Sequence, residues 1–326
     1  MVGDRLGWSI DDDRSRLVAT ARRLGYAVGN NAALRFARGR AVFQHNHFNA
    51  LQPRWLGSSH SLGLSYFHGL PGTDGYPEFD RAYEALQANA ARIARGQVTH
   101  DEMRDLVAGA GVPDERIFKI PIGVDLDHFP LAPERAGSLF VVGSFVKDGV
   151  GMDEGLEPKL LKGPDTFVAV IARLQERIPE LSVLLTGPAR GYVRRELERL
   201  GVPYRHLVVG SREELGRVYH DVDVCLVTSR QEGGPKSALE AMASGVPFVS
   251  TRVGQAAELV RDGENGLLAD VDDVDALAGA VERVHADGEL RARLRAGGRH
   301  TAEAHAEERL DPRWAELLEG FVERAR

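Results

Sequence analysis

The sequence predicts an α/β protein that contains two doubly wound, Rossmann-like units. In both halves, short runs rich in β-branched residues alternate with helical patterns, which is typical of parallel strands joined by right-handed crossovers. A length of 326 residues is sufficient for two ordinary domains. A segment with two prolines, residues 126–137, separates the two sets of elements. We therefore expect an N-terminal domain over residues 1–130 and a C-terminal domain that begins at residue 131.

The first unit opens with a helix that residues 11–13 can cap and Gly25 can end. The apolar face of this helix consists of Leu17, Val18, Ala21 and Leu24. Short apolar runs then predict buried strands at 41–44, 62–67, 97–100 and 117–120. Helical patterns lie between them at 78–95 and 101–110, and each ends at a glycine. This order predicts a small parallel sheet.

The second unit repeats the alternation more clearly. Strand-like runs occur at 139–142, 181–186, 206–209, 223–228 and 247–251. One intervening helix has an apolar face made by Phe167, Val170, Ile171, Leu174 and Ile178. The tail over 274–326 is almost wholly helical in pattern, and Pro312 predicts a break in it.

Composition and charge exclude several classes of protein. The chain has 41 basic and 48 acidic residues, a formal net charge of −7, which argues against a general nucleic-acid binder. Cys225 is the only cysteine, so an intramolecular disulfide and a multi-thiolate metal site are both excluded. Apolar runs are too short to cross a bilayer, and the N-terminus lacks the features of a signal peptide. We expect a cytoplasmic protein that acts on small molecules.

The strongest functional pattern is TSRQEGGPKSALEAMASGVPFVSTRVGQAAELV, residues 228–260. A buried strand leads into a glycine-rich turn and then into a helix with Pro235 near its first turn. Such a turn offers free backbone N–H groups and the positive end of a helix dipole, which favour phosphate. Glu232 and Glu240 flank the turn and would repel phosphate. These carboxylates are therefore better suited to accept hydrogen bonds from sugar and ribose hydroxyls.

The stretch EGGPKSALEAMASGVPFVST resembles the signature of family 4 glycosyltransferases, which are retaining enzymes of the GT-B fold. Five further segments agree in the right order: SYFHG (65–69), FKIPIGVDLDHF (118–129), LFVVGS (139–144), LLKGPDTF (160–167) and ENGLLAD (264–270). The resemblance spans roughly residues 60–285 and is more specific than any single motif. It implies two domains that face a central cleft. It also implies a donor domain over 131–306 and a terminal helix, 307–326, that crosses back to the N-terminal domain.

The resemblance also implies roles for individual residues. Three would be catalytic: His68 facing the acceptor and the transferring sugar, Lys162 on the departing diphosphate, and Glu232 on the sugar hydroxyls. Glu240 would bind the ribose of the nucleotide. The full expected donor-binding set is Gly143, Ser144, Lys147, Lys162, Glu232, Gly233, Gly234, Pro235, Lys236, Ser237 and Glu240. No metal ion and no cofactor would be required.

Two departures from the family pattern matter. The family usually has an arginine after the glycine of the first donor-domain strand, where this chain has Ser144. Either Lys147 supplies the missing charge, or the insertion over 148–161 repositions this pair. The acceptor half is also short, and its glycine-rich loop is reduced to residues 6–8.

We therefore expect transfer of a sugar from a nucleotide-diphosphate sugar to an acceptor hydroxyl, with peripheral membrane contact if the acceptor is a lipid. One alternative is a sugar-nucleotide epimerase of the same fold, and another is a non-catalytic protein that binds nucleotide sugars. No Gly-x-Gly-x-x-Gly or P-loop motif is present, which disfavours a dinucleotide-dependent oxidoreductase or a P-loop nucleotidase. We interpret His45 and His47 as polar residues of a cleft, not as a metal pair.

Overall fold

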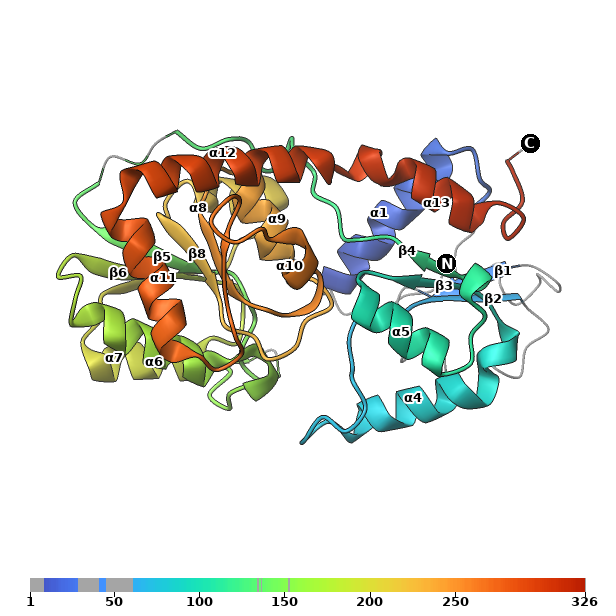
Figure 1. Cartoon of the computed structure of the whole chain (residues 1–326), viewed down its shortest axis with the longest axis horizontal. Coiled ribbons are helices and arrows are strands. Elements are labelled where there is room, and N and C mark those ends of the chain that lie inside the picture. The colour runs from blue at the N-terminus through green and yellow to red at the C-terminus, as the bar shows by residue number, and fades with distance from the viewer. Residues whose placement is uncertain are drawn as a thin grey trace. The chain divides into compact units, whose positions relative to one another are not determined.

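The computed structural model describes residues 9–28, 41–44, 61–133, 135, 137–151 and 153–325. Internal contacts divide the chain into two compact units (Figure 1). The first comprises 1–121 and 308–326, and the second comprises 122–307. The proline-rich segment led us to place the boundary after residue 130, but the chain enters the second unit after Pro121. The physical reason is packing, since Val124 and Phe129 are buried in a core of the second unit.

The first unit contains a four-stranded parallel sheet in the order β1-β2-β3-β4. Its strands are β1 (Ala41–Gln44), β2 (Ser61–Ser65), β3 (Ile93–Val98) and β4 (Ile117–Lys119). The helices that follow β2 and β3 are α4 (Pro77–Asn89) and α5 (Asp101–Gly109). Leu64, Leu86, Val98 and Val107 form part of the core between this sheet and these helices.

Two helices from opposite ends of the sequence cover another part of this sheet. They are α1 (Ser9–Arg23) and α13 (Asp311–Leu318), which contact each other (Figure 1). Leu17 and Leu317 are buried in one cluster with Phe43 and Ile120. The Arg23 guanidinium binds the Asp311 carboxylate at 2.7 Å. The C-terminal residues therefore belong to the first unit, and Pro312 lies in the first turn of α13.

The second unit contains a six-stranded parallel sheet in the order β10-β9-β8-β5-β6-β7. Its strands are β5 (Phe140–Ser144), β6 (Leu181–Thr186), β7 (Tyr204–Leu207), β8 (Val224–Val227), β9 (Phe248–Thr251) and β10 (Leu267–Ala269). The chain builds outward from β5 to β7 on one side and from β8 to β10 on the other. The order of strands therefore reverses between the neighbouring strands β5 and β8.

Helices cover both faces of this sheet (Figure 1). They are α6 (Pro164–Gln175), α7 (Gly191–Leu200), α8 (Arg212–Tyr219), α9 (Lys236–Ala243), α10 (Gly254–Leu259), α11 (Val274–Ala286) and α12 (Gly288–Ala304). One core lies under α6, α7 and α11 and includes Phe167, Ile171 and Val281. A second core includes Tyr219 and Phe248 and lies under α8, α9 and α10. In the part of the chain that the structure describes, no helix is both long enough and apolar enough to cross a bilayer.

The predicted elements are present, with shifts at several ends. The helix expected over 78–95 ends at Asn89, and β3 begins at Ile93, four residues before the expected strand. Ile93 is fully buried, so tertiary packing decides this boundary. The sequence analysis treated 264–270 only as a motif, but Leu267–Ala269 forms the edge strand β10, which is shorter than an ordinary strand.

Candidate functional site

The residues expected to bind the donor follow two neighbouring strands of the second unit. Ser144 ends β5, and the segment 228–235 follows β8. These strands lie at the point where the strand order reverses. In doubly wound sheets, the carboxyl ends of strands at such a switch point form the usual ligand-binding crevice. The topology therefore brings the two sequence motifs to one edge of one sheet.

A short 3₁₀ turn, Leu160–Lys162, carries Lys162 to this edge and leads into α6. Gly163 has a φ of 61°, in the left-handed region, and a Cβ there would lie 1.9 Å from the carbonyl oxygen of Thr228. The Thr228 hydroxyl also donates to the Gly163 carbonyl at 2.8 Å. This position therefore requires glycine, and the close approach locks the lysine loop against the end of β8.

A second contact between these loops comes from Arg230. Its backbone N–H donates to the Leu161 carbonyl at 2.9 Å, and its guanidinium donates to the Leu160 carbonyl at 2.6 Å. The same guanidinium binds the Asp165 carboxylate through two nitrogens. The hydrogen bonds to the Asp165 carboxylate have the largest effect and outweigh burial, so the pKa of Arg230 is raised above its ordinary value. Arg230 thus links the loop after β8 to the lysine loop through hydrogen bonds.

The central feature of the site is an ion pair between Lys162 and Glu232. The Lys162 Nζ lies 2.6 Å from the Glu232 Oε2, and these side chains are only 18% and 10% exposed. The Ser229 hydroxyl donates to the other carboxylate oxygen, Oε1, at 2.8 Å. Ser229 is itself fully buried. The two residues that the sequence analysis assigned to diphosphate and sugar are therefore in direct contact with each other.

The turn between Glu232 and α9 is held by the first turn of α10. Gly254 has a φ of 49°, and a Cβ there would lie 2.2 Å from the Glu232 carbonyl oxygen. The N–H of Gln255 donates to the Gly233 carbonyl at 3.3 Å. Pro235 caps the N-terminus of α9, so Lys236 is the first helical residue and Ser237 is buried behind it. The backbone from Gly233 to Pro235 is thus fixed next to the positive end of a helix.

Glu240 lies inside α9 and is 8% exposed. Its Oε2 accepts a hydrogen bond from the Tyr219 hydroxyl at 2.9 Å. Burial, with Glu240 adding to it, raises the pKa of Tyr219 well above its ordinary value, so the phenol stays protonated and donates. The Phe145 ring stacks on the Tyr219 ring at 3.9 Å. The sequence analysis did not identify Tyr219, because nothing in its local pattern distinguishes it from a core tyrosine.

The serine that replaces the family arginine has an arginine partner from another loop. Arg190, just before α7, donates from Nη2 to the Ser144 hydroxyl and from Nη1 to the Ser144 and Thr186 carbonyls, all at 2.9 Å. Its Nε lies 3.0 Å from Asp148. Both side chains are buried, and Arg190 is only 1% exposed. Burial of the Asp148 carboxyl raises its pKa, and the nearby Arg190 charge offsets only part of this effect. No sequence pattern points to this cluster, since an arginine in a Gly-Pro-Ala-Arg-Gly turn ordinarily faces solvent.

The remaining donor-set residues of β5 and its loop have different surroundings. Gly143 pairs with Leu184 on β6 and Cys225 on β8, and a Cβ there would meet the side chains of Phe145 and Val222, so packing restricts this position. Lys147 lies three residues after Ser144 and is partly buried. Burial lowers the pKa of its ammonium.

His68 lies in the first unit, three residues after the end of β2. Its ring stacks on Phe67 with 5.0 Å between centroids and meets the edge of Phe79 at 5.9 Å. Its acceptor role stays a prediction. His45, His47 and residues 6–8 lie outside the described residues. Among the residues that are described, no group of three or more His, Cys, Asp or Glu is placed to hold a metal ion.

Comparison with known proteins shows to which family this site belongs. A family model described as "Glycosyl transferases group 1" matches residues 156–301. This segment is a group 1 glycosyltransferase domain. The match confirms the resemblance predicted from residues 228–260. The group 1 domain holds Lys162, Glu232 and Glu240, together with the whole glycine-rich turn.

Curated relatives extend this likeness beyond the group 1 domain. The chain is 37% identical over 225 residues to D-inositol 3-phosphate glycosyltransferase of Xylanimonas cellulosilytica, covering 65% of this chain and 53% of the relative. It is 33% identical over 231 residues to a GDP-mannose-dependent alpha-(1-6)-phosphatidylinositol monomannoside mannosyltransferase of Mycolicibacterium smegmatis, covering 67% of this chain and 60% of the relative. The chain thus spans little more than half the length of these curated relatives.

Solved structures agree on the fold. Anabaena HepE in complex with UDP superposes with a TM-score of 0.72 at 18% identity and covers 92% of this chain and 82% of that one. Sucrose-phosphate synthase of Thermosynechococcus elongatus superposes with a TM-score of 0.71 at 21% identity and covers 85% and 72%. The two-unit, parallel-sheet architecture that carries the group 1 domain is therefore the GT-B fold predicted from the sequence.

Proposed function

We propose that this protein is a retaining glycosyltransferase that transfers a sugar from a nucleotide-diphosphate sugar to an acceptor hydroxyl. The observation that carries the proposal is the Lys162–Glu232 pair at the switch point of the second sheet. A cation and a hydroxyl-accepting carboxylate lie beside the N-terminus of α9, where a sugar diphosphate needs both. Glu240, buried within the same helix, is the candidate to bind the ribose.

In this proposal the bound donor replaces the internal ion pair. The diphosphate takes the Lys162 ammonium and the backbone N–H groups of the glycine-rich turn, and the sugar hydroxyls donate to Glu232. Ser229 keeps its bond to the second carboxylate oxygen and so holds the Glu232 side chain in place. Because Lys162 and Glu232 are paired before the donor arrives, their charges neutralise each other in a site that is largely shielded from water.

The proposed reaction then follows an electrostatic route. The bond between the anomeric carbon and the phosphate oxygen breaks, and the acceptor oxygen forms the new bond on the same face of the sugar. The acceptor proton passes to a phosphate oxygen. Lys162 and the backbone N–H groups stabilise the negative charge that develops on the departing diphosphate. No enzyme carboxylate acts as a nucleophile, and we propose that no metal ion is needed.

His68 belongs to the acceptor half in this proposal, and the acceptor carries a hydroxyl group. If the acceptor is a lipid, the protein would contact a membrane peripherally. One relative is named for phosphatidylinositol monomannoside, a lipid, which supports testing such acceptors first. We propose no nucleic-acid partner, in keeping with the net negative charge.

The donor is tested first by nucleotide binding. UDP, GDP, ADP and TDP are compared by thermal shift, because a ligand that binds the folded state raises its stability by mass action. The diphosphate that binds best selects the sugar nucleotides for turnover assays with and without acceptor, with and without chelator. Release of nucleotide diphosphate that requires an acceptor, with a product of unchanged anomeric configuration, supports the proposal. Acceptor-independent conversion of the donor sugar would instead show an epimerase.

The ion pair is tested by two substitutions and a control. Lys162→Ala removes one positioned electrostatic group and should lower kcat by roughly 10²–10³. Glu232→Gln should lower kcat similarly and weaken binding of the intact sugar nucleotide more than binding of the free diphosphate. Lys119→Ala, which removes a lysine that pairs with Asp101 in the first unit, serves as the control. Equal activity of all three variants would overturn the assignment, and so would activity abolished by chelator and restored by magnesium or manganese.

A further inference from the structure

The second unit has a cavity at the edge of its sheet opposite the site described above. Its volume is about 680 Å³. Its wall includes Phe140 at the start of β5, Asp223 just before β8 and Pro247 just before β9. These are the amino ends of the strands, whereas Lys162 and Glu232 lie beyond the carboxyl ends. The cavity is therefore separate from the proposed donor site and lies wholly within one unit.

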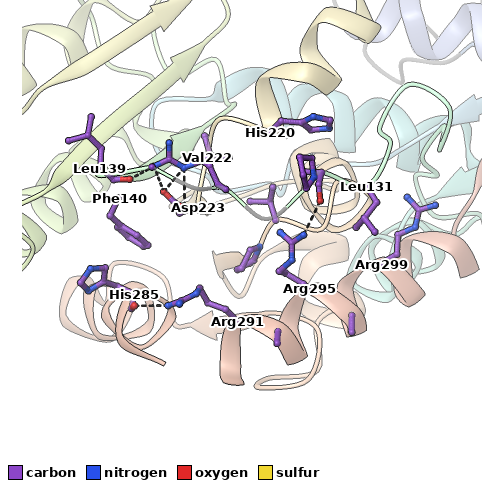
Figure 2. Close-up of a pocket in the computed structure, with 18 of the residues that line it drawn as sticks. Leu131, Leu139, Phe140, His220, Val222, Asp223, His285, Arg291, Arg295 and Arg299 are labelled. Atoms are coloured by element: carbon purple, nitrogen blue, oxygen red, sulfur yellow. Dashed lines mark hydrogen bonds and ion pairs between the residues drawn. The ribbon is translucent and has the colours of Figure 1, made fainter. Parts of the chain in front are cut away.

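A row of arginines on α12 forms one wall of this cavity. Arg291, Arg295 and Arg299 recur every four residues, and Figure 2 shows their side chains along the same stretch of helix. Side chains four residues apart on a helix are neighbours, with about 5–6 Å between their Cβ atoms. The row thus lines one wall of the cavity with three guanidinium groups.

The carboxylates of the cavity are already occupied by other cations. Three pairs account for them: Asp223 with Arg135 at 2.9 Å, Glu303 with Arg299 at 2.7 Å, and Glu180 with His285 at 2.9 Å. None of these carboxylates lies within ion-pair distance of Arg291 or Arg295. Among the residues that the structure describes on this wall, Arg291 and Arg295 therefore have no acidic partner.

The hydrogen bonds of these two arginines go only to backbone carbonyls. Arg291 donates from Nη1 to the Val284 and His285 carbonyls in the last turn of α11, and Arg295 donates from Nη2 to the Ala132 carbonyl at 2.9 Å (Figure 2). Within the described part of the chain, the Nε and the other terminal nitrogen of each guanidinium make no hydrogen bond. One terminal nitrogen of each guanidinium thus holds the side chain in place, and the remaining N–H groups can donate to an oxyanion.

Apolar side chains also line this cavity. Val222 and Val246 are buried in its lining, and Leu131 at its rim is 55% exposed. A phosphate ion alone would fill only a small part of 680 Å³. We propose that this cavity binds a phosphate monoester of a small molecule, with the phosphate on Arg291 and Arg295 and the organic part against Leu131 and the two valines.

The proposal is tested by isothermal titration calorimetry with two probes, inorganic phosphate and phenyl phosphate, at constant ionic strength. The donor site is saturated with whichever of UDP, GDP, ADP and TDP binds best in the thermal-shift comparison. Both probes should bind saturably, and phenyl phosphate should bind more tightly because its ring covers apolar surface. Binding should persist in Lys162→Ala, since that substitution affects only the opposite edge. Loss of binding in Lys162→Ala would place the anion in the donor site and overturn the proposal.

Substitutions on α12 then locate the ion. Ala296 lines the cavity beside Arg295 and is exposed, so Ala296→Glu adds a negative charge without removing any existing hydrogen bond. We expect it to weaken binding of both probes by about tenfold or more, the equivalent of one charge-assisted hydrogen bond. Arg295→Gln should act in the same direction, because it removes the guanidinium.

The control is Arg293→Gln, which changes net charge by the same amount as Ala296→Glu on the same helix. Arg293 donates to the Gly263 carbonyl and is not part of the cavity wall. It should bind both probes like the unmodified protein. Equal binding by Ala296→Glu and Arg293→Gln, or no saturable binding by the unmodified protein, would overturn the proposal.

Discussion

The guanidinium of Arg190 donates to the hydroxyl of Ser144 at 2.9 Å, so a buried arginine from the loop after β6 contacts the serine that ends β5. The same group binds carbonyls of both strands and the Asp148 carboxylate. It therefore joins the carboxyl ends of two neighbouring strands to the loop that follows β5. Its burial indicates a structural role beneath the proposed donor site.

We predict that Arg190→Met strongly destabilises the protein. The substitution leaves Asp148 buried without its partner, and breaking a buried pair in this way typically costs about 3–5 kcal/mol in the free energy of unfolding. Urea denaturation measures the change. Arg205→Met, which breaks an exposed pair with Asp221, is the matched control and should cost less than about 1 kcal/mol. Similar losses in the two variants would contradict a special role for Arg190.

We predict that Glu240→Ala weakens binding of the nucleotide even when no sugar is attached. A hydrogen bond to a charged group is worth about 1.5–3 kcal/mol, so the Kd should rise about tenfold or more. Tyr219→Phe is the comparison, because it removes the hydroxyl that donates to Glu240 and leaves the carboxylate in place. It should have a smaller effect on affinity. Unchanged affinity in Glu240→Ala would show that this carboxylate does not bind the ribose.

We predict that His68→Ala lowers turnover by roughly 10² or more, the usual scale for one positioned catalytic group. Affinity for the free nucleotide should hardly change, because interactions used only in the reaction appear in kcat. Kinetics, nucleotide titration and thermal unfolding are measured on the same variant. Since His68 packs between Phe67 and Phe79, a purely structural role predicts a lower Tm with normal specific activity. That outcome would end the catalytic assignment.

We predict a pH-dependent contribution of His128 to stability. Its ring binds Asp125 at 2.5 Å and Glu213 at 2.9 Å. Partial burial lowers the pKa of His128, but these two carboxylates outweigh burial and raise the pKa above its ordinary value. A raised histidine pKa stabilises the folded state below the unfolded pKa of about 6.5, and this stabilisation is lost as pH rises through the folded pKa.

His128→Gln should therefore lower the Tm more at pH 6 than at pH 9. His220→Gln is the control, since that ring bonds to the Pro130 carbonyl at 3.3 Å and, among the described residues, forms no ion pair with a carboxylate. A Tm difference that is the same at both pH values would contradict the ion-pair explanation.

The sequence by itself determined the alternating architecture and the resemblance to group 1 glycosyltransferases. Strand and helix periods differ, so alternating elements were visible locally, and the run from Glu232 to Glu240 is contiguous in the chain. Local signals were weaker at element ends. At Ile93, burial in the assembled core extends β3 beyond the strand that its sequence pattern predicts.

Only the tertiary structure decided which charges meet. Lys162 and Glu232 are 70 residues apart, and Arg190 and Ser144 are 46 apart, so no local period connects either pair. Each contact depends on which strands are neighbours and on how closely backbone segments approach, as Gly163 approaches Thr228. The arginine row on α12 has a helical period, but the carbonyls that its guanidinium groups bind lie at the end of α11, in the segment before β5 and at the end of α9. These relationships arise from strand order and packing, which the pattern of single residues does not encode.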